Sequence, residues 1–277
     1  MSVLDKFRLD GKVCVITGGA GLLGIQHAEA ILDAGGRVVL IDINEAKLAS
    51  AVLSLSAKLT GRANRICGYP FDITDEEAVL SGVARISRNF GSIDILINNA
   101  ANDPKLEDGG KNLTRLENFP MQVWQDDFNV GVTGAFLMSR EIGQRMAKNG
   151  RGVILNIASD LAVVAPDQRI YRQEGLAENE QPVKPVSYSV TKHALIGLTR
   201  YLATYWANKG VRVNSISPGG VSNHQPEEFV AKLTNLIPMG RMAEVDEYKA
   251  AVLFLCSDAS SYMTGENLII NGGRTCW

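Results

Sequence analysis

The sequence predicts an α/β protein with a single doubly wound, Rossmann-type domain, in which helices cover both faces of a parallel sheet. Short runs rich in β-branched residues alternate along the chain with longer stretches of helical periodicity. A glycine-rich turn follows the first run and opens a helix, which is the position of a dinucleotide site in such folds. No linker or internal repeat divides the 277 residues, so one domain over residues 1–277 is expected.

The expected elements follow one another in regular order. Strands are expected at residues 13–17, 37–41, 65–69, 93–97, 153–158, 211–215 and 267–270. Helices are expected at residues 23–34, 45–59, 75–89 and 186–207. Because strands joined by crossover helices run parallel and are covered on both faces, this order indicates repeated βαβ units.

Composition argues against several classes of protein. Apolar residues make up 45% of the chain and charged residues 21%, as in ordinary globular domains. A net charge of −2 with no long run of one sign argues against binding to nucleic acid or to an anionic membrane. The first residues carry no apolar signal core, and no apolar run has the length of a membrane span. A cytoplasmic protein is therefore expected.

The cysteines and histidines show no metal-ligand spacing, so no metal site is expected. The four cysteines are scattered without a C-x-x-C pair and are interpreted as reduced thiols. They are Cys14, Cys67, Cys256 and Cys276.

The glycine-rich turn reads T-G-G-A-G-L-L-G. Gly18, Gly21 and Gly24 would let the backbone approach a pyrophosphate, and the N-terminus of the following helix would supply N–H donors and positive potential. The neighbouring Leu22 and Leu23 are expected to touch the same cofactor. The alternative is a tight turn that serves packing alone.

Acidic residues follow the second and third expected strands. Asp42 stands 24 positions after Gly18, where a carboxylate accepts the ribose hydroxyls of NAD and repels the phosphate of NADP. Its neighbour Ile43 is neutral, so no basic residue there reverses the preference. The alternative for Asp42 is a solvated carboxylate that opens a helix. Asp72, followed by Ile73, is placed either to accept a hydrogen bond from the adenine amino group or to cap a helix.

The expected helix at residues 186–207 carries Tyr188 and Lys192, four residues apart. That spacing puts a phenol and an ammonium on one face of the helix. A nearby cation favours the phenolate, which lowers the pKa of a tyrosine towards the working range of a general acid–base catalyst. Tyrosine and lysine are common on helices, so the pair alone does not establish catalysis.

Several motifs in the same order resemble those of the classical short-chain dehydrogenase/reductase family, and the similarity covers nearly the whole chain. After the glycine-rich turn come Asn98-Asn99-Ala100-Ala101 in place of Asn-Asn-Ala-Gly, Asn129 in W-Q-D-D-F-N-V, Ser159 in V-I-L-N-I-A-S, Tyr188 and Lys192 in Y-x-x-x-K, the loop S-P-G-G-V at 217–221, and the closing segment 254–273.

The resemblance implies an NAD(H)-dependent oxidoreductase that interconverts a secondary alcohol and a ketone. Tyr188 would exchange a proton with the substrate oxygen, and Lys192 would stabilise the tyrosinate and hold the nicotinamide ribose. Ser159 would hydrogen-bond the substrate oxygen, and Asn129 would orient a water that links Lys192 to solvent. Further cofactor contacts are implied for Asn99, Ala100, Ala101, Pro218, Gly219 and Val221.

Two other functions remain as alternatives. The glycine spacing of the turn is that of the extended branch of the family, which favours dehydration or epimerisation of a nucleotide-linked sugar as a second hypothesis. A third hypothesis is a dinucleotide-binding regulator without turnover.

Two further departures from the family pattern concern the length of segments. The segment between Asn102 and Phe119 is longer and more polar than usual. A polar insertion at about 166–185 separates Ser159 from Tyr188, and it is expected to form a lid near the active site, with a plain surface loop as the alternative.

The insertion and the helix at 186–207 indicate the class of substrate and the oligomeric state. The charged and amide side chains of the insertion favour a hydroxyl-rich small molecule, such as a sugar or polyol, over a steroid or fatty acyl chain. His224, in the loop after Gly219, is a weaker candidate for substrate contact. The helix at 186–207 has a wide apolar face that commonly forms a subunit interface in the family, so a homo-tetramer or homo-dimer is expected.

Overall fold

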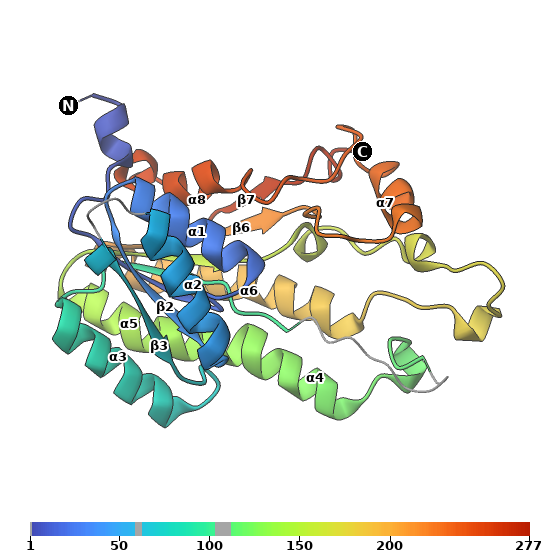
Figure 1. Cartoon of the computed structure of the whole chain (residues 1–277), viewed down its shortest axis with the longest axis horizontal. Coiled ribbons are helices and arrows are strands. Elements are labelled where there is room, and N and C mark those ends of the chain that lie inside the picture. The colour runs from blue at the N-terminus through green and yellow to red at the C-terminus, as the bar shows by residue number, and fades with distance from the viewer. Residues whose placement is uncertain (1, 59–62, 103–111) are drawn as a thin grey trace.

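The computed structural model describes residues 2–58, 63–102 and 112–277. In this part of the chain the strands form one parallel sheet of seven strands, in the order β3-β2-β1-β4-β5-β6-β7 (Figure 1). They are β1 (Val13–Thr17), β2 (Arg37–Asp42), β3 (Ile66–Pro70), β4 (Ile95–Asn98), β5 (Gly152–Ile157), β6 (Val211–Pro218) and β7 (Asn267–Ile270). The chain builds outwards from β1 to β3 and then restarts on the other side of β1 with β4. This confirms the doubly wound fold predicted from the sequence.

Helices cover both faces of the sheet (Figure 1). One apolar cluster packs α1 (Leu22–Asp33), α2 (Glu45–Lys58) and α8 (Lys249–Cys256) against one face. A second cluster packs α3 (Glu76–Phe90), α5 (Ala135–Lys148) and α6 (Val186–Trp206) against the other. Every side chain of β1 is buried, because a central parallel strand has a helix layer on each side.

A buried polar chain fixes α6 to the middle of the sheet. The amide of Asn98, at the end of β4, donates to Ser139 Oγ on α5 at 2.9 Å and to Asn156 Oδ1 on β5 at 2.8 Å. The amide of Asn156 in turn donates to Thr199 Oγ1 on α6 at 2.8 Å. These buried hydrogen bonds link α6 to β5 and, through Asn98, to β4 and α5.

Several boundaries differ from those expected. β4 begins at Ile95 rather than at residue 93, and β6 continues to Pro218. α2 ends at Lys58, while residue 59 lies outside the described residues. Helices α4 (Met121–Phe128), α5, α7 (Glu227–Thr234) and α8 had not been assigned from the sequence. A π-helical segment, Asn129–Gly134, joins α4 to α5.

No helix in the described ranges is both long and apolar enough to cross a bilayer. Within the same ranges, no group of three or more His, Cys, Asp or Glu side chains is arranged to hold a metal ion.

Candidate active site

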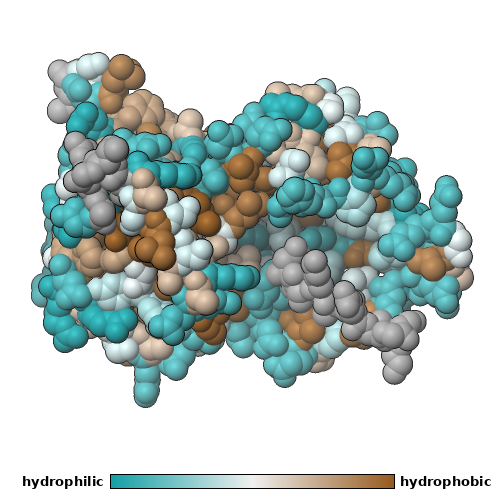
Figure 2. All heavy atoms as spheres, viewed as in Figure 1, coloured by the Kyte–Doolittle hydropathy of each residue, from teal (hydrophilic) through white to brown (hydrophobic). Residues whose placement is uncertain are grey.

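A cavity of about 540 Å³ lies at the carboxyl edge of the sheet, where β1, β4, β5 and β6 all end. Figure 2 shows a recess near the middle of the viewed face, with both hydrophilic and hydrophobic residues at its edge. Many of the residues predicted from the sequence line the cavity: Gly18, Gly21, Leu22, Leu23, Asp42, Asn99, Ala100, Ala101, Ser159, Tyr188, Lys192, Pro218, Gly219 and Val221. The structure therefore brings together residues that are widely separated in the sequence.

The glycine-rich turn has no room for side chains. Gly18 has a φ of +59°, and a Cβ there would lie 2.8 Å from the Cα of Ala100. A Cβ on Gly24 would lie 2.4 Å from the carbonyl oxygen of Gly18, so Gly24 allows α1 to pack against the turn and does not line the cavity. Gly21 is the N-cap of α1 and offers no side-chain cap. This leaves N–H groups at the start of α1 for a phosphate, so the turn fits a dinucleotide.

Thr17 and Asn99 hold the ends of β1 and β4 together beside the turn. Thr17 Oγ1 accepts the N–H groups of Asn99 and Ala100 at 3.1 and 3.2 Å. The Asn99 side-chain amide donates to the carbonyl oxygens of Thr17 and Gly18 at 3.1 and 3.0 Å. The backbone at Ala100 is thus placed against Gly18, which explains why the asparagine motif accompanies the glycine turn.

A neighbouring cavity of about 450 Å³ shares Gly18, Asp42, Ala100 and Ala101 with the first. Its other lining residues include Ile43, Asp72, Ile73 and Asn129, all predicted from the sequence. The carboxylate of Asp42 accepts the N–H of Ala20 at 3.2 Å and that of Asn44 at 3.0 Å, which fixes its orientation. Among the described residues that line this second cavity there is no Lys or Arg.

Asp72 does not cap a helix. One of its carboxylate oxygens accepts the N–H and the hydroxyl of Thr74, both at 2.8 Å. The N-cap of α3 is Asp75, whose carboxylate accepts the N–H groups of Glu77 and Ala78. The helix-capping alternative for Asp72 was therefore wrong, because the next acidic residue occupies the cap position.

Tyr188 and Lys192 lie in the first turns of α6 and face the first cavity. The ammonium of Lys192 is buried and donates to the carbonyl oxygen of Ile157, the last residue of β5, at 2.8 Å. It lies 5.8 Å from the centre of the Tyr188 ring. The predicted pairing of a phenol and an ammonium on one helix face is thus present, and the sheet fixes the ammonium.

Ser159 follows β5 and is held by its two neighbours. Its Oγ accepts the N–H of Leu161 at 3.2 Å and donates to the carboxylate of Asp160 at 3.1 Å. The second carboxylate oxygen of Asp160 accepts a hydrogen bond of 2.8 Å from the guanidinium of Arg274. Both Asp160 and Arg274 line the cavity. Neither was singled out from the sequence. The position of Asp160 directly after Ser159 was the one available signal.

Asn129 lies at the start of the π-helical segment and lines the second cavity, not the first. The segment packs against α6 at Gly131, where a Cβ would lie 3.4 Å from Thr191, the neighbour of Lys192. π-Helical turns inside α-helices are often associated with functional sites. The structure thus places Asn129 near α6 but not among the residues that line the cavity with Tyr188.

The insertion at 166–185 supplies two side chains to the cavity, Tyr171 and Lys184. The ammonium of Lys184 lies 4.0 Å from the centre of the Tyr188 ring. The ring of Tyr171 packs on Phe229 of α7, with 5.6 Å between ring centres. The insertion thus contacts both α6 and α7 beside the cavity. His224, the weaker candidate for substrate contact, is not among the lining residues, whereas its neighbour Gln225 is.

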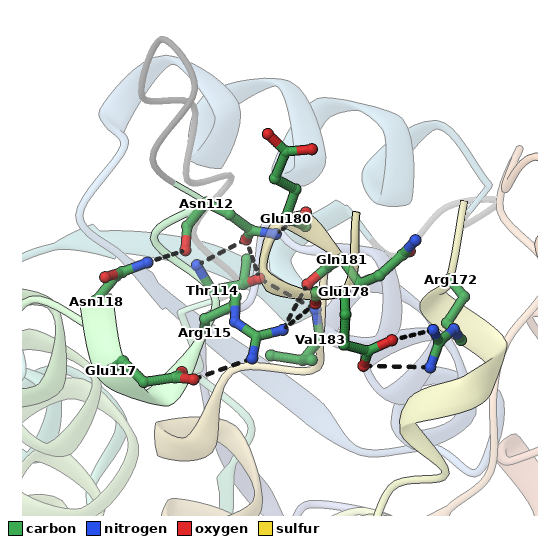
Figure 3. A network of polar contacts seen from close by, with 10 residues as sticks. All are labelled: Asn112, Thr114, Arg115, Glu117, Asn118, Arg172, Glu178, Glu180, Gln181 and Val183. Carbon is green, nitrogen blue, oxygen red and sulfur yellow. Dashed lines mark hydrogen bonds and ion pairs between the residues drawn. The ribbon is translucent and has the colours of Figure 1, made fainter. Parts of the chain in front are cut away.

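The insertion is also bound to the other segment that departs from the family pattern (Figure 3). The amide of Asn112 donates to the carbonyl oxygen of Glu180 at 2.7 Å, and Arg115 donates to that of Glu178 at 2.9 Å. The N–H of Val183 donates to Thr114 Oγ1 at 3.1 Å. Of the segment 102–119, residues 103–111 lie outside the described residues. Its described part and the insertion therefore form one polar unit.

Two family models match the chain. One, described as short chain dehydrogenase, matches residues 12–171, and the other, described as Enoyl-(Acyl carrier protein) reductase, matches residues 176–275. Three curated relatives are similar along almost their whole length. A D-threitol dehydrogenase of Mycolicibacterium smegmatis is 35% identical, covering 99% of this chain and 97% of the relative. An NAD-dependent glycerol dehydrogenase of Listeria innocua is 35% identical, covering 98% and 97%. A galactitol 2-dehydrogenase (L-tagatose-forming) of Cereibacter sphaeroides is 34% identical, covering 100% of both chains.

Solved structures of similar chains include complexes with both nicotinamide dinucleotides. A gluconate 5-dehydrogenase from Burkholderia cenocepacia in complex with NADP and tartrate superposes with a TM-score of 0.84, at 27% identity and 100% coverage of both chains. An NAD+-bound xylitol dehydrogenase superposes with a TM-score of 0.82, at 28% identity, covering 96% of this chain and 99% of that one.

Proposed function

Because the chain belongs to the short-chain dehydrogenase/reductase family, we propose that it is an NAD-dependent dehydrogenase that oxidises a secondary hydroxyl of a polyol or sugar to a ketone. The observation that carries the proposal is the single cavity in which Ser159, Tyr188 and Lys192 meet the glycine-rich turn. When bound there, the nicotinamide supplies the hydride acceptor. The residues of the chain bind and orient the reactants and move the proton.

The proposed proton path starts at Tyr188. The phenolate form takes the proton of the substrate hydroxyl, and the nearby ammonium of Lys192 stabilises that form electrostatically. Lys192 keeps its place because its ammonium donates a hydrogen bond to the carbonyl oxygen of Ile157. Ser159 binds the substrate oxygen, and Asn129, in the segment that packs against α6, orients a water that returns the proton to solvent. These roles are those implied by the family motifs. The shared cavity supports the roles of Ser159, Tyr188 and Lys192, whereas Asn129 lines the neighbouring cavity.

The choice of NAD over NADP rests on Asp42. The carboxylate is held by two backbone N–H groups at the edge of both cavities. The 2′-phosphate of NADP would face this negative charge and, among the described residues lining the second cavity, would meet no Lys or Arg. The residues for cofactor contact are those predicted from the sequence. Gly24 is the exception, since we assign it to packing of the turn.

The substrate end of the cavity is lined by both polar and apolar side chains. The polar ones are Tyr171, Lys184, Gln225 and Arg274, and the apolar ones are Phe229, Leu233 and Met242. Several polar groups lining one cavity suit a substrate with several hydroxyl groups. The relatives that match the whole chain are named for threitol, glycerol and galactitol, which supports a polyol over a nucleotide-linked sugar.

The remaining proposals concern organisation. We propose one catalytic domain with the insertion as a lid, a cytoplasmic location, and a homo-dimer or homo-tetramer. The outer face of α6 carries Tyr201 and Tyr205, which are 64% and 62% exposed and stack on each other at 5.9 Å between ring centres. Large exposed aromatic side chains on one helix face favour burial against a second copy.

An NAD-coupled screen of polyols, sugars and hydroxy acids tests the function directly. We expect NADH formation with one or a few linear polyols, at a rate that falls by about 10²–10⁴-fold in the Tyr188→Phe variant used as the control. Binding of NADH without turnover of any alcohol would instead support a non-catalytic dinucleotide-binding regulator.

A further inference from the structure

The C-terminal tail places a guanidinium in the cavity beside the reacting centre. Arg274 lines the cavity with a side chain that is 9% exposed, and its Nη1 donates to a carboxylate oxygen of the buried Asp160 at 2.8 Å. A guanidinium carries N–H donors on three nitrogens. Among the described residues, only Nη1 of the three has a hydrogen-bond partner, and neither Nε nor Nη2 is shut off from solvent. Their N–H groups are therefore open to a molecule bound in the cavity.

The backbone of the tail is shaped to deliver this side chain. Gly272 and Gly273 have φ values of +65° and +90°, which L-residues with side chains rarely adopt. A Cβ on Gly272 would lie 2.7 Å from the side chain of Ile237, so the tail passes close to the segment after α7. Asn271 Oδ1 accepts the N–H of Gly273 at 3.2 Å and closes the turn just before Arg274. The side chain thus leaves an ordered turn at one end and is held by a carboxylate at the other.

Asp160 links this guanidinium to the reacting centre. One of its carboxylate oxygens lies 3.1 Å from Ser159 Oγ, and the other lies 2.8 Å from Arg274 Nη1. Two hydrogen bonds and the O–C–O of one carboxylate therefore separate Ser159 from the guanidinium. A substrate whose reacting oxygen binds Ser159 would span a similar gap with two hydrogen bonds and the O–C–C–O of two adjacent hydroxyl-bearing carbons. The hydroxyl next to the reacting one is thus the group that Arg274 can reach.

The charge balance of the pair decides between a hydroxyl and a carboxylate at this place. Asp160 compensates the charge of Arg274, and both side chains are almost fully removed from solvent. A second carboxylate brought to the same guanidinium would add a negative charge close to Asp160, where solvent screens it poorly. A neutral hydroxyl accepts from an N–H of Arg274 without that repulsion. The pair therefore suits an uncharged group.

We propose that Arg274 is a specificity-determining residue that donates a hydrogen bond to the substrate hydroxyl adjacent to the one being oxidised. Asp160 holds the guanidinium in place and makes the subsite neutral, so the substrate is an uncharged vicinal polyol and not a sugar acid. The inference rests on the proposed dehydrogenase function and narrows its substrate class. Both residues lie just outside the motifs that resemble the family.

Two small alcohols that differ by one hydroxyl test the subsite. Propylene glycol has a hydroxyl next to its secondary alcohol, and isopropanol has none. We expect the wild-type protein to oxidise propylene glycol to hydroxyacetone at a kcat/KM about 10–10²-fold above that for isopropanol, the range for a hydrogen bond from a charged donor. Arg274→Lys keeps the charge beside Asp160 but loses the planar fork of donors, so this ratio should fall to within about 3-fold.

A second variant and a matched control separate recognition from structure. Asp160→Asn/Arg274→Met removes both charges together, so that neither is left buried alone, and should also bring the ratio to within about 3-fold. Arg241→Lys makes the same exchange in an exposed pair with Glu247 outside the cavity and should leave the ratio unchanged. A mere clamp on the tail would lower both efficiencies equally, so the ratio reports on the subsite. Thermal unfolding and NADH binding of each variant are measured alongside.

D-glucitol and D-gluconate test the neutral character of the subsite. We expect the wild-type protein to prefer D-glucitol, and Asp160→Asn, which leaves the guanidinium charge unbalanced, to narrow that preference. No preference for propylene glycol in the wild type, or one that survives in both Arg274 variants, would overturn the proposal. A wild-type preference for D-gluconate would overturn it as well, and its loss in Arg274→Lys would assign the guanidinium to a carboxylate. A wild-type protein inactive towards every alcohol would instead refute the proposed function, which keeps the two failures distinguishable.

Discussion

Cofactor choice can be tested by removing one charge. We expect the wild-type protein to use NAD with a kcat/KM well above that for NADP, and Asp42→Asn to narrow this gap. Asparagine has the same size and can still accept the N–H of Ala20 or Asn44, so the end of β2 should keep its shape. Only the negative charge facing the 2′ position of the ribose is lost.

The magnitude follows from the surroundings of Asp42. Two unit charges 4 Å apart repel by about 4 kcal/mol at an effective dielectric constant of about 20. Asp42 is only half-buried, so solvent screening reduces this repulsion to about 2–3 kcal/mol. Since each 1.4 kcal/mol is a factor of about ten, NADP should be disfavoured by about 10²-fold. Asp42→Asn should recover most of that factor without producing a preference for NADP, because no cation is added.

The assay is the initial rate of alcohol oxidation at saturating substrate, with NAD or NADP varied. Asp72→Asn is the matched control, because Asp72 lines the same second cavity but one of its carboxylate oxygens accepts a hydrogen bond from the N–H of Thr74. It should leave the ratio of the two efficiencies unchanged. Adding Ile43→Arg to Asp42→Asn should reverse the preference, since Ile43 is 72% exposed beside the site and can carry a phosphate-binding side chain. Equal use of both cofactors by the wild-type protein would refute the reasoning.

Three further predictions concern the proton, the lid and stability. Tyr188→Phe should lower kcat by about 10²–10⁴-fold with little change in NADH affinity, and turnover within a few-fold of wild type would mean that another group moves the proton. Arg115→Ala, which frees the insertion at Glu178, should raise KM for the alcohol and leave NADH binding intact, whereas an unchanged KM would make the insertion a surface loop. Burial lowers the pKa of His27 from 6.5 to about 4, so its neutral form contributes stability that is complete above pH 6.5 and is lost as the pH falls towards 4. Between pH 7 and pH 5 this loss is about 2 kcal/mol, and the fall in Tm should be smaller in His27→Met than in wild type or in the control His193→Met.

The fold and the convergence of the main motifs could be predicted because both depend on strong local patterns. Parallel strands buried on both faces are continuous apolar runs, and their carboxyl ends meet at one edge. Once Ser159 is assigned to the end of one strand and Tyr188 to a following helix, the parallel order of the strands brings both side chains to the same edge of the sheet. Asp42 was placed in the same way, by the strand that precedes it.

The remainder of the site depends on contacts that leave no periodic signal. The pair of Asp160 and Arg274 joins positions far apart in the sequence, and one charged residue in a tail looks like any other. The π-helical segment at Asn129 changes the backbone hydrogen bonding of a helix without a distinctive composition. The helix-capping alternative for Asp72 failed because Asp75 occupies the N-cap of α3, which depends on local geometry finer than sequence spacing.

The division of the cavity between rigid and variable elements has a consequence for substrate choice. Lys192 and Ser159 are fixed by β5, and α6 is tied to the sheet through Asn156 and Thr199, so the reacting groups are held by the core. The outer part of the cavity is instead lined by the insertion, by α7 and by the tail, and the insertion packs on α7 through Tyr171 and Phe229. Changes in these outer elements can alter which hydroxyl groups are recognised without moving the core groups. We therefore expect exchange of the insertion with that of a relative to change relative kcat/KM among polyols more than it changes kcat on the best of them.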